Sequence, residues 1–141
     1  GCRVPQPTPD SRVILIAERD HNVRELQRHF LEKAGLDVEF ADDGEAALEL
    51  ARLIRPAAIV TEILVPKIDG LTLCRRLGEN PVTRDIPVVV FSILAAERRA
   101  EEAGATAFLR KPLVESTFVA TVQNAIAAQP TASREQQWAS Q

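Results

Sequence analysis

Side chains that could do chemistry stand directly after several apolar runs of this sequence. They combine carboxylates, a hydroxyl group and cations, and they are Glu18, Arg19, Asp20, Glu62, Ser92, Arg110 and Lys111. Carboxylate oxygens are ligands that a hard cation such as Mg²⁺ prefers, and Arg or Lys can pair with them. Each residue alone could be an ordinary polar loop residue, and Asp20 could be the N-cap of a helix. Their occurrence after four separate runs favours a shared site.

One of these runs ends in a single acidic residue. In IVTEILVPKIDG, residues 59–70, the strand-like piece ends at Glu62. A short loop with Pro66 then leads to the pair Asp69-Gly70, which begins the next helix. In open α/β sheets the working site lies beyond the carboxyl ends of the strands. Glu62 is therefore the central candidate residue.

Strand-like and helix-like segments alternate along the chain. Aliphatic and β-branched runs predict strands at 12–17, 37–40, 57–62, 87–91 and 106–109. Helical spacing and end signals predict helices between them, including 70–79 and 95–103, with Asp43 as one N-cap and Gly35 closing the first helix. The apolar residues Phe118, Val119, Val122 and Ile126 mark a final helix. This order predicts an α/β fold with a parallel sheet covered by helices on both faces.

The composition excludes several classes of protein. Of the 141 residues, 45% are hydrophobic, which is enough for one core without metals or disulfides. The net charge of -3 and the absence of a basic stripe argue against nucleic-acid binding, and no apolar run is long enough to span a membrane. Cys2, Cys74, His21 and His29 show no metal or disulfide spacing, so we expect a cytoplasmic protein. We expect a flexible lead-in over 1–11, one domain over 12–128, and a tail or linker over 129–141.

Residues 12–128 resemble the receiver domains of two-component response regulators. The most specific part is similar to the family's Asp-x-x-x-Pro-x-x-Asp-Gly signature, with Pro66, Asp69 and Gly70 at matching offsets. Further landmarks are the run 86–92, the pair Gly104-Ala105 and the pair Lys111-Pro112. The resemblance implies a flavodoxin-like (βα)5 fold, in which a doubly wound parallel five-stranded sheet has the strand order 2-1-3-4-5.

The resemblance also implies roles for individual residues. In the family, an aspartate ending the third strand accepts a phosphoryl group from a histidine kinase, and two acids after the first strand help it to hold Mg²⁺. Glu62 takes the phosphoacceptor position, Glu18 takes the place of the first acid, and Arg19 takes the place of the second. The other matching positions are the two phosphoryl contacts, the aromatic switch residue and the cis-proline turn, at Ser92, Lys111, Phe108 and Pro112.

Two of these positions depart from the family pattern. Glutamate is longer than aspartate by one methylene, which moves the carboxylate by about 1.5 Å, and a misplacement of about 1 Å can slow a reaction by about 10²-fold. The guanidinium of Arg19 cannot ligate Mg²⁺. We therefore expect no metal and no cofactor, and no enzymatic activity. We also expect Arg19 to pair with Glu62 or Glu18 as an internal substitute for the metal.

The expected function is that of an atypical, phosphorylation-independent pseudo-receiver that acts by protein–protein interaction. Its partner would be a histidine kinase, an effector domain or a second copy, bound through the face formed by the fourth helix, the fifth strand and the fifth helix. Three alternatives remain open. They are a Mg²⁺-dependent phosphoacceptor with aberrant ligands, a disused site that has drifted, and a flavodoxin-like domain for a small ligand. The turn AERDHN has no glycine to cradle a phosphate, which argues against the last.

Overall fold

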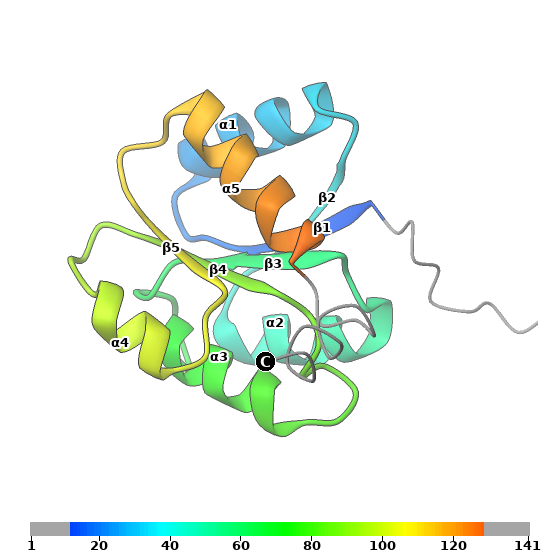
Figure 1. Cartoon of the computed structure of the whole chain (residues 1–141), viewed down its shortest axis with the longest axis vertical. Helices are drawn as coiled ribbons and strands as arrows, with labels where there is room; N and C mark the ends of the chain where they lie inside the picture. The colour runs from blue at the N-terminus through cyan, green and yellow to red at the C-terminus, as the bar shows by residue number, and fades with distance from the viewer. Residues whose placement is uncertain (1–11, 129–141) are drawn as a thin grey trace, which may run out of the picture.

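A central five-stranded parallel sheet organises the molecule, with helices packed on both of its faces (Figure 1). The computed structural model describes residues 12–128, so the predicted lead-in over 1–11 and tail over 129–141 lie outside the described residues. The strands are β1 (Val13–Ala17), β2 (Asp37–Ala41), β3 (Ala58–Thr61), β4 (Val88–Ser92) and β5 (Ala107–Arg110). The helices are α1 (His21–Lys33), α2 (Gly44–Ile54), α3 (Gly70–Glu79), α4 (Glu97–Glu102) and α5 (Glu115–Ala127).

The strand order is β2-β1-β3-β4-β5, as the resemblance implied, and all neighbouring strands are parallel. Helices α1 and α5 cover one face of the sheet, while α2, α3 and α4 cover the other (Figure 1). Ala17 of β1 is in register with Thr61 of β3, and Ser92 of β4 with Arg110 of β5. The parallel register therefore brings the polar residues that follow these strands to one edge of the sheet.

Aliphatic side chains fill a separate core on each face. On the α2–α3–α4 face, alternate strand residues such as Leu15 and Ile59 pack against Leu73 and Leu77 of α3. On the α1–α5 face, the remaining strand residues pack against Leu31 of α1 and against residues of α5 that include Phe118 and Val122. Because both faces of the central strands are buried, these strands read as continuous apolar runs instead of alternating ones.

Most of the predicted element boundaries agree with the structure within one or two residues. Asp43 caps α2 through a hydrogen bond from the amide of Ala46, and Gly35 adopts a φ of +87° just after α1, as predicted. The helix predicted at 95–103 is shorter, Glu97–Glu102, because its N-cap residue is Ala96, which offers no side-chain acceptor to the first free amides. The strand predicted at 57–62 ends at Thr61, so Glu62 is the first residue after β3.

None of the described helices is long and apolar enough to cross a membrane.

One buried polar side chain in α1 has an unusual environment. Gln27 is only 1% exposed, and neither its Oε1 nor its Nε2 has a hydrogen-bond partner among the described residues. A buried amide without partners costs about 1–3 kcal/mol. We expect Gln27→Leu, which keeps a similar volume, to raise the free energy of unfolding by about 1 kcal/mol or more. Urea unfolding measures the change, and the exposed Gln123 of α5 provides a control, since Gln123→Leu should change it by less than about 0.5 kcal/mol. A loss of stability in Gln27→Leu would contradict this expectation.

Candidate functional site

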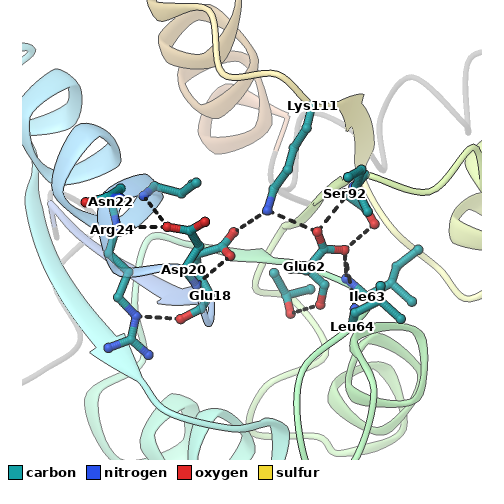
Figure 2. Close-up of polar contacts among 12 residues, drawn as sticks. Glu18, Asp20, Asn22, Arg24, Glu62, Ile63, Leu64, Ser92 and Lys111 are labelled. Atoms are coloured by element: carbon teal, nitrogen blue, oxygen red, sulfur yellow. Dashed lines mark hydrogen bonds and ion pairs between the residues drawn. The ribbon is translucent and has the colours of Figure 1, made fainter.

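The carboxylate of Glu62 lies at the centre of the sheet edge. Glu62 follows β3 directly and is 5% exposed, and its amide donates to the carbonyl oxygen of Ala17 in β1 at 3.0 Å. Its Oε2 accepts hydrogen bonds from the amide of Ile63 at 2.6 Å, from the amide of Leu64 at 3.3 Å, and from the hydroxyl group of Ser92 at the end of β4 (Figure 2). Three donors, two from the loop after β3 and one from the end of β4, therefore converge on one carboxylate oxygen.

The other oxygen of Glu62 has two donors of its own. The amide of Ile93 donates to Oε1 at 3.2 Å, and the ammonium group of Lys111 lies 3.1 Å from the same atom. Lys111 follows β5, and its amide donates to the carbonyl oxygen of Ser92. This bond joins the loop after β5 to the end of β4. Five donors, one of them cationic, thus surround the Glu62 carboxylate. Such a set of converging donors is an anion site, and here a side chain of the protein occupies it.

Lys111 also binds a second buried carboxylate. Its Nζ lies 2.9 Å from Oε1 of Glu18, which follows β1 and is 2% exposed (Figure 2). The other oxygen of Glu18 accepts a hydrogen bond from the amide of Asp20 at 3.1 Å. The ammonium group also lies 5.6 Å from the ring centre of Phe91, within the range of a cation–π contact. One cation therefore bridges two carboxylates that come from different strands.

The loop after β1 is held by a residue that the sequence did not single out. The guanidinium of Arg24 donates to the carbonyl oxygen of Glu18, to the carbonyl oxygen of Ala41 at 3.1 Å and to Asp42 at 3.2 Å. Asp20 caps α1, because its Oδ1 accepts from the amides of the second and third residues after it, Asn22 and Val23. No spacing rule links Arg24 to strand ends so distant in the chain, so sequence reasoning missed it.

The loop between β3 and α3 is stabilised at its far end. Asp69 caps α3, with its Oδ1 accepting from the amide of Thr72 at 2.8 Å, and the amide of Gly70 donates to the carbonyl oxygen of Ile63 at 2.9 Å. The carbonyl oxygen of Pro66 accepts from the amide of Gly44 at 3.0 Å. These bonds fix the backbone that presents the two loop amides to Glu62.

Comparison with known proteins agrees with this geometry. The family model "Response regulator receiver domain" matches residues 14–123. The chain belongs to this family. It is 34% identical over 119 residues to the response regulator PleD of Caulobacter vibrioides, a match that covers 81% of this chain and 26% of PleD. It is 36% identical over 113 residues to the response regulator MprA of Mycolicibacterium vanbaalenii, covering 78% of this chain and 48% of MprA.

A solved structure shows the same receiver fold. A putative response regulator from Chloroflexus aurantiacus superimposes with a TM-score of 0.79 and 33% sequence identity, over 84% of this chain and 99% of that one. The chain therefore spans only part of the length of these curated relatives, but nearly all of the chain from Chloroflexus aurantiacus.

Four of the predicted site residues come together, whereas the side chains of Arg19 and Asp20 do not join them. Glu18, Glu62, Ser92 and Lys111 form one connected cluster, as expected from the strand ends. The expected pairing of Arg19 with Glu62 or Glu18 is wrong. Arg19 is exposed and makes no ion pair with any residue in the described part of the chain, and Lys111 makes both contacts instead. Both residues lie in the loop after β1, where Glu18 is 2% exposed and Arg19 lies at the surface.

The remaining predicted positions lie around this receiver cluster. The peptide bond between Lys111 and Pro112 is cis, as the resemblance implied. Phe108 of β5 is half-buried, packs against the core of the α2–α3–α4 face, and lines a surface hollow with Arg98 of α4 and Arg110. Pro66 and Asp69 are exposed, and Gly70 is buried beneath the loop. Cys74 is a buried free thiol on α3, and burial raises its pKa to about 11.

Hydrogen bonding determines the charge state of the cluster. Burial raises the pKa of Glu62, but the bonds from Ser92, Lys111 and the amides of Ile93 and Leu64 outweigh burial and hold it below its usual value of 4.5. Burial lowers the pKa of Lys111, but its bonds to Glu18 and Glu62 outweigh burial and raise it above 10.5. The ion pair between Glu62 and Lys111 therefore persists across the neutral pH range.

These shifts predict how stability depends on pH. Because the folded protein lowers the pKa of Glu62, this residue stabilises the fold at pH values above about 4.5, and the contribution is lost as the pH falls through the folded pKa. We expect Glu62→Gln to be less stable than the natural chain at neutral pH and to lose stability less steeply below about pH 4.5. Urea unfolding of both proteins at a series of pH values from about 6 to about 3 measures how the free energy of unfolding changes with pH. The same change with pH in the natural chain and in Glu62→Gln would show that Glu62 does not contribute to acid sensitivity.

Proposed function

We propose that this domain is a phosphorylation-independent receiver, in which Glu62 makes the contacts that a phosphoryl group makes in other members of the family. One observation carries the proposal. The Glu62 carboxylate accepts bonds from Ser92 and Lys111, the two side chains to which the family resemblance assigns contacts with the phosphoryl group. The extra methylene of glutamate extends the carboxylate toward these groups by about 1.5 Å relative to aspartate.

Saturation of the carboxylate also argues against transfer chemistry. A nucleophilic oxygen needs a free lone pair and a clear approach, whereas both oxygens of Glu62 already accept hydrogen bonds or an ion pair. The second acid of the family's metal site is replaced by Arg19, which is exposed. Since phosphoryl transfer depends on positioning and charge neutralisation, these features favour a domain that holds one conformation without phosphate.

The output would then be binding to another protein. Serine contact with the phosphoryl group is coupled in the family to movement of the loop and helix that follow the fourth strand. Here Ser92 is already turned toward Glu62, and its hydroxyl also accepts a bond from the amide of Leu94 in that loop. The face formed by α4, β5 and α5 would therefore stay in one arrangement. It would bind an effector domain, a histidine kinase or a second copy of the chain.

A mass measurement tests the proposal. The purified chain is incubated with a small phosphodonor, such as acetyl phosphate, and Mg²⁺, and its intact mass is then measured. We expect no mass change. A gain of one phosphoryl group that maps to Glu62 would overturn the proposal and favour the alternative, a Mg²⁺-dependent acceptor with aberrant ligands. A phosphorylated receiver from the same family, treated in parallel, shows that the donor is active.

A further inference from the structure

The family's metal site does not fit the residues present here. Mg²⁺ requires oxygen ligands in near-octahedral geometry. In this chain the acids available at the sheet edge are Glu18 and Glu62, and no group of three metal-binding side chains occurs among the described residues. The Oε1 atoms of both acids already bind Lys111, at 2.9 and 3.1 Å. The Oε2 atoms accept backbone or hydroxyl hydrogen bonds.

We infer that the ammonium group of Lys111 is the resident cation of this site and that it replaces the divalent ion. Glu18 then acts as a positioning residue, because it holds the ammonium group against Glu62 from the opposite side (Figure 2). This inference rests on the proposed function and concerns the regulation of the same site. An internal ion pair holds the domain in one conformation, and Mg²⁺ does not change that conformation. It also differs from the sequence-based expectation, in which Arg19 filled this place.

Charge and burial support this role for Lys111. The side chains of Glu18 and Glu62 are 3% and 5% exposed, so two carboxylates so close together need a cation between them. Lys111 supplies it from the position directly after β5, and its side chain is only 16% exposed. The flexible stem of a lysine allows the ammonium group to reach both acids as a point charge, whereas a guanidinium favours one planar, two-point contact.

Chemical labelling of lysine tests the inference in the intact chain. The sequence contains three lysines, and Lys33 and Lys67 have side chains 61% and 59% exposed, so they serve as internal references. We expect Lys111 to react with an amine acylating reagent several-fold more slowly than either reference, as followed by peptide mass spectrometry. Addition of Mg²⁺ should leave this protection unchanged. If Mg²⁺ brings Lys111 to the reference rate, the ion displaces the ammonium group and the inference is wrong.

Two variants separate the role of Glu18 from general loosening of the loop. Glu18→Gln removes one partner of Lys111 and should increase its labelling rate several-fold. Asp20→Asn is the matched control, because Asp20 caps α1 without touching Lys111 and asparagine is also a good N-cap. Equal protection of Lys111 in the natural chain and in Glu18→Gln would overturn the positioning role. The labelling result is independent of the mass assay. A chain that gains a phosphoryl group but whose Lys111 labelling does not respond to Mg²⁺ contradicts the proposed function alone. A chain that gains no phosphoryl group but whose Lys111 labelling rises with Mg²⁺ contradicts this inference alone.

Discussion

Replacing Glu62 and Arg19 together by aspartate is expected to produce a receiver that takes up one phosphoryl group, where the natural chain takes up none. Glu62→Asp withdraws the carboxylate by about 1.5 Å from Ser92 and Lys111, which opens space for a phosphoryl group among the same donors. Arg19→Asp supplies the missing acid beside Glu18, so that Mg²⁺ has oxygen ligands at the sheet edge. Both changes act on the same step, so their effects should be far from additive.

The measurement is intact mass after incubation with acetyl phosphate, with and without Mg²⁺. We expect the double variant to gain one phosphoryl mass only when Mg²⁺ is present. Each single variant should gain less, because a misplacement of about 1 Å costs about 10²-fold in rate and a missing oxygen ligand weakens Mg²⁺ binding. If the double variant folds and remains unmodified, the loss of transfer chemistry lies outside these two positions. If Arg19→Asp alone restores full uptake, the length of Glu62 is not what prevents transfer.

Two glycines in α3 are expected to respond in opposite ways to replacement by alanine. A Cβ atom on Gly70 would lie 2.3 Å from the carbonyl oxygen of Glu62 and 3.0 Å from the Cα of Ile63, and both are backbone atoms. The loop must therefore shift, and overpacking of this kind costs about 1–3 kcal/mol. A Cβ on Gly78 would meet nothing within 4 Å. Gly78→Ala should raise the free energy of unfolding by about 0.5 kcal/mol, since alanine is the better helix former.

Urea unfolding of the two variants measures this difference, and the m-value should stay constant if both remain two-state. Gly70→Ala should also increase labelling of Lys111, because the loop that moves carries the amides of Ile63 and Leu64 that hold Glu62. Gly78→Ala should leave the labelling unchanged. A Gly70→Ala variant as stable as the natural chain would mean that the loop between β3 and α3 can shift without loss of stability. That loop would then not fix the position of the Glu62 carboxylate.

Much of the architecture follows from local patterns. The apolar runs, the N-cap at Asp43, the start of a helix at Asp69-Gly70 and the glycine that closes the first helix at 35 are local features, and the structure bears each of them out. Helix α3 begins and ends at the predicted residues. The start of α4 was less predictable, because Ala95 and Ala96 favour helix by propensity but offer no side-chain cap.

The sequence by itself determined which chemical groups reach the sheet edge. The alternation of strands and helices places Glu18, Glu62, Ser92 and Lys111 at strand ends, and the parallel sheet brings those ends together. It also determined that the position normally held by aspartate carries a longer acid and that the second acid is absent. These statements need only residue types and order.

Only the tertiary structure decided which of these groups touch. Arg19 and Lys111 were both available as partners for the two acids, and chain proximity favoured Arg19. In the loop after β1 the side chain of Arg19 is exposed while that of Glu18 is buried, and Lys111 reaches both acids from the residue after β5. The backbone amides of Ile63, Leu64 and Ile93 carry no signal in the sequence, because every residue except proline has such an amide. Their convergence on Glu62 results from the paths of two loops. Contacts between residues far apart in the chain depend on directions that the fold imposes, and no local pattern encodes them.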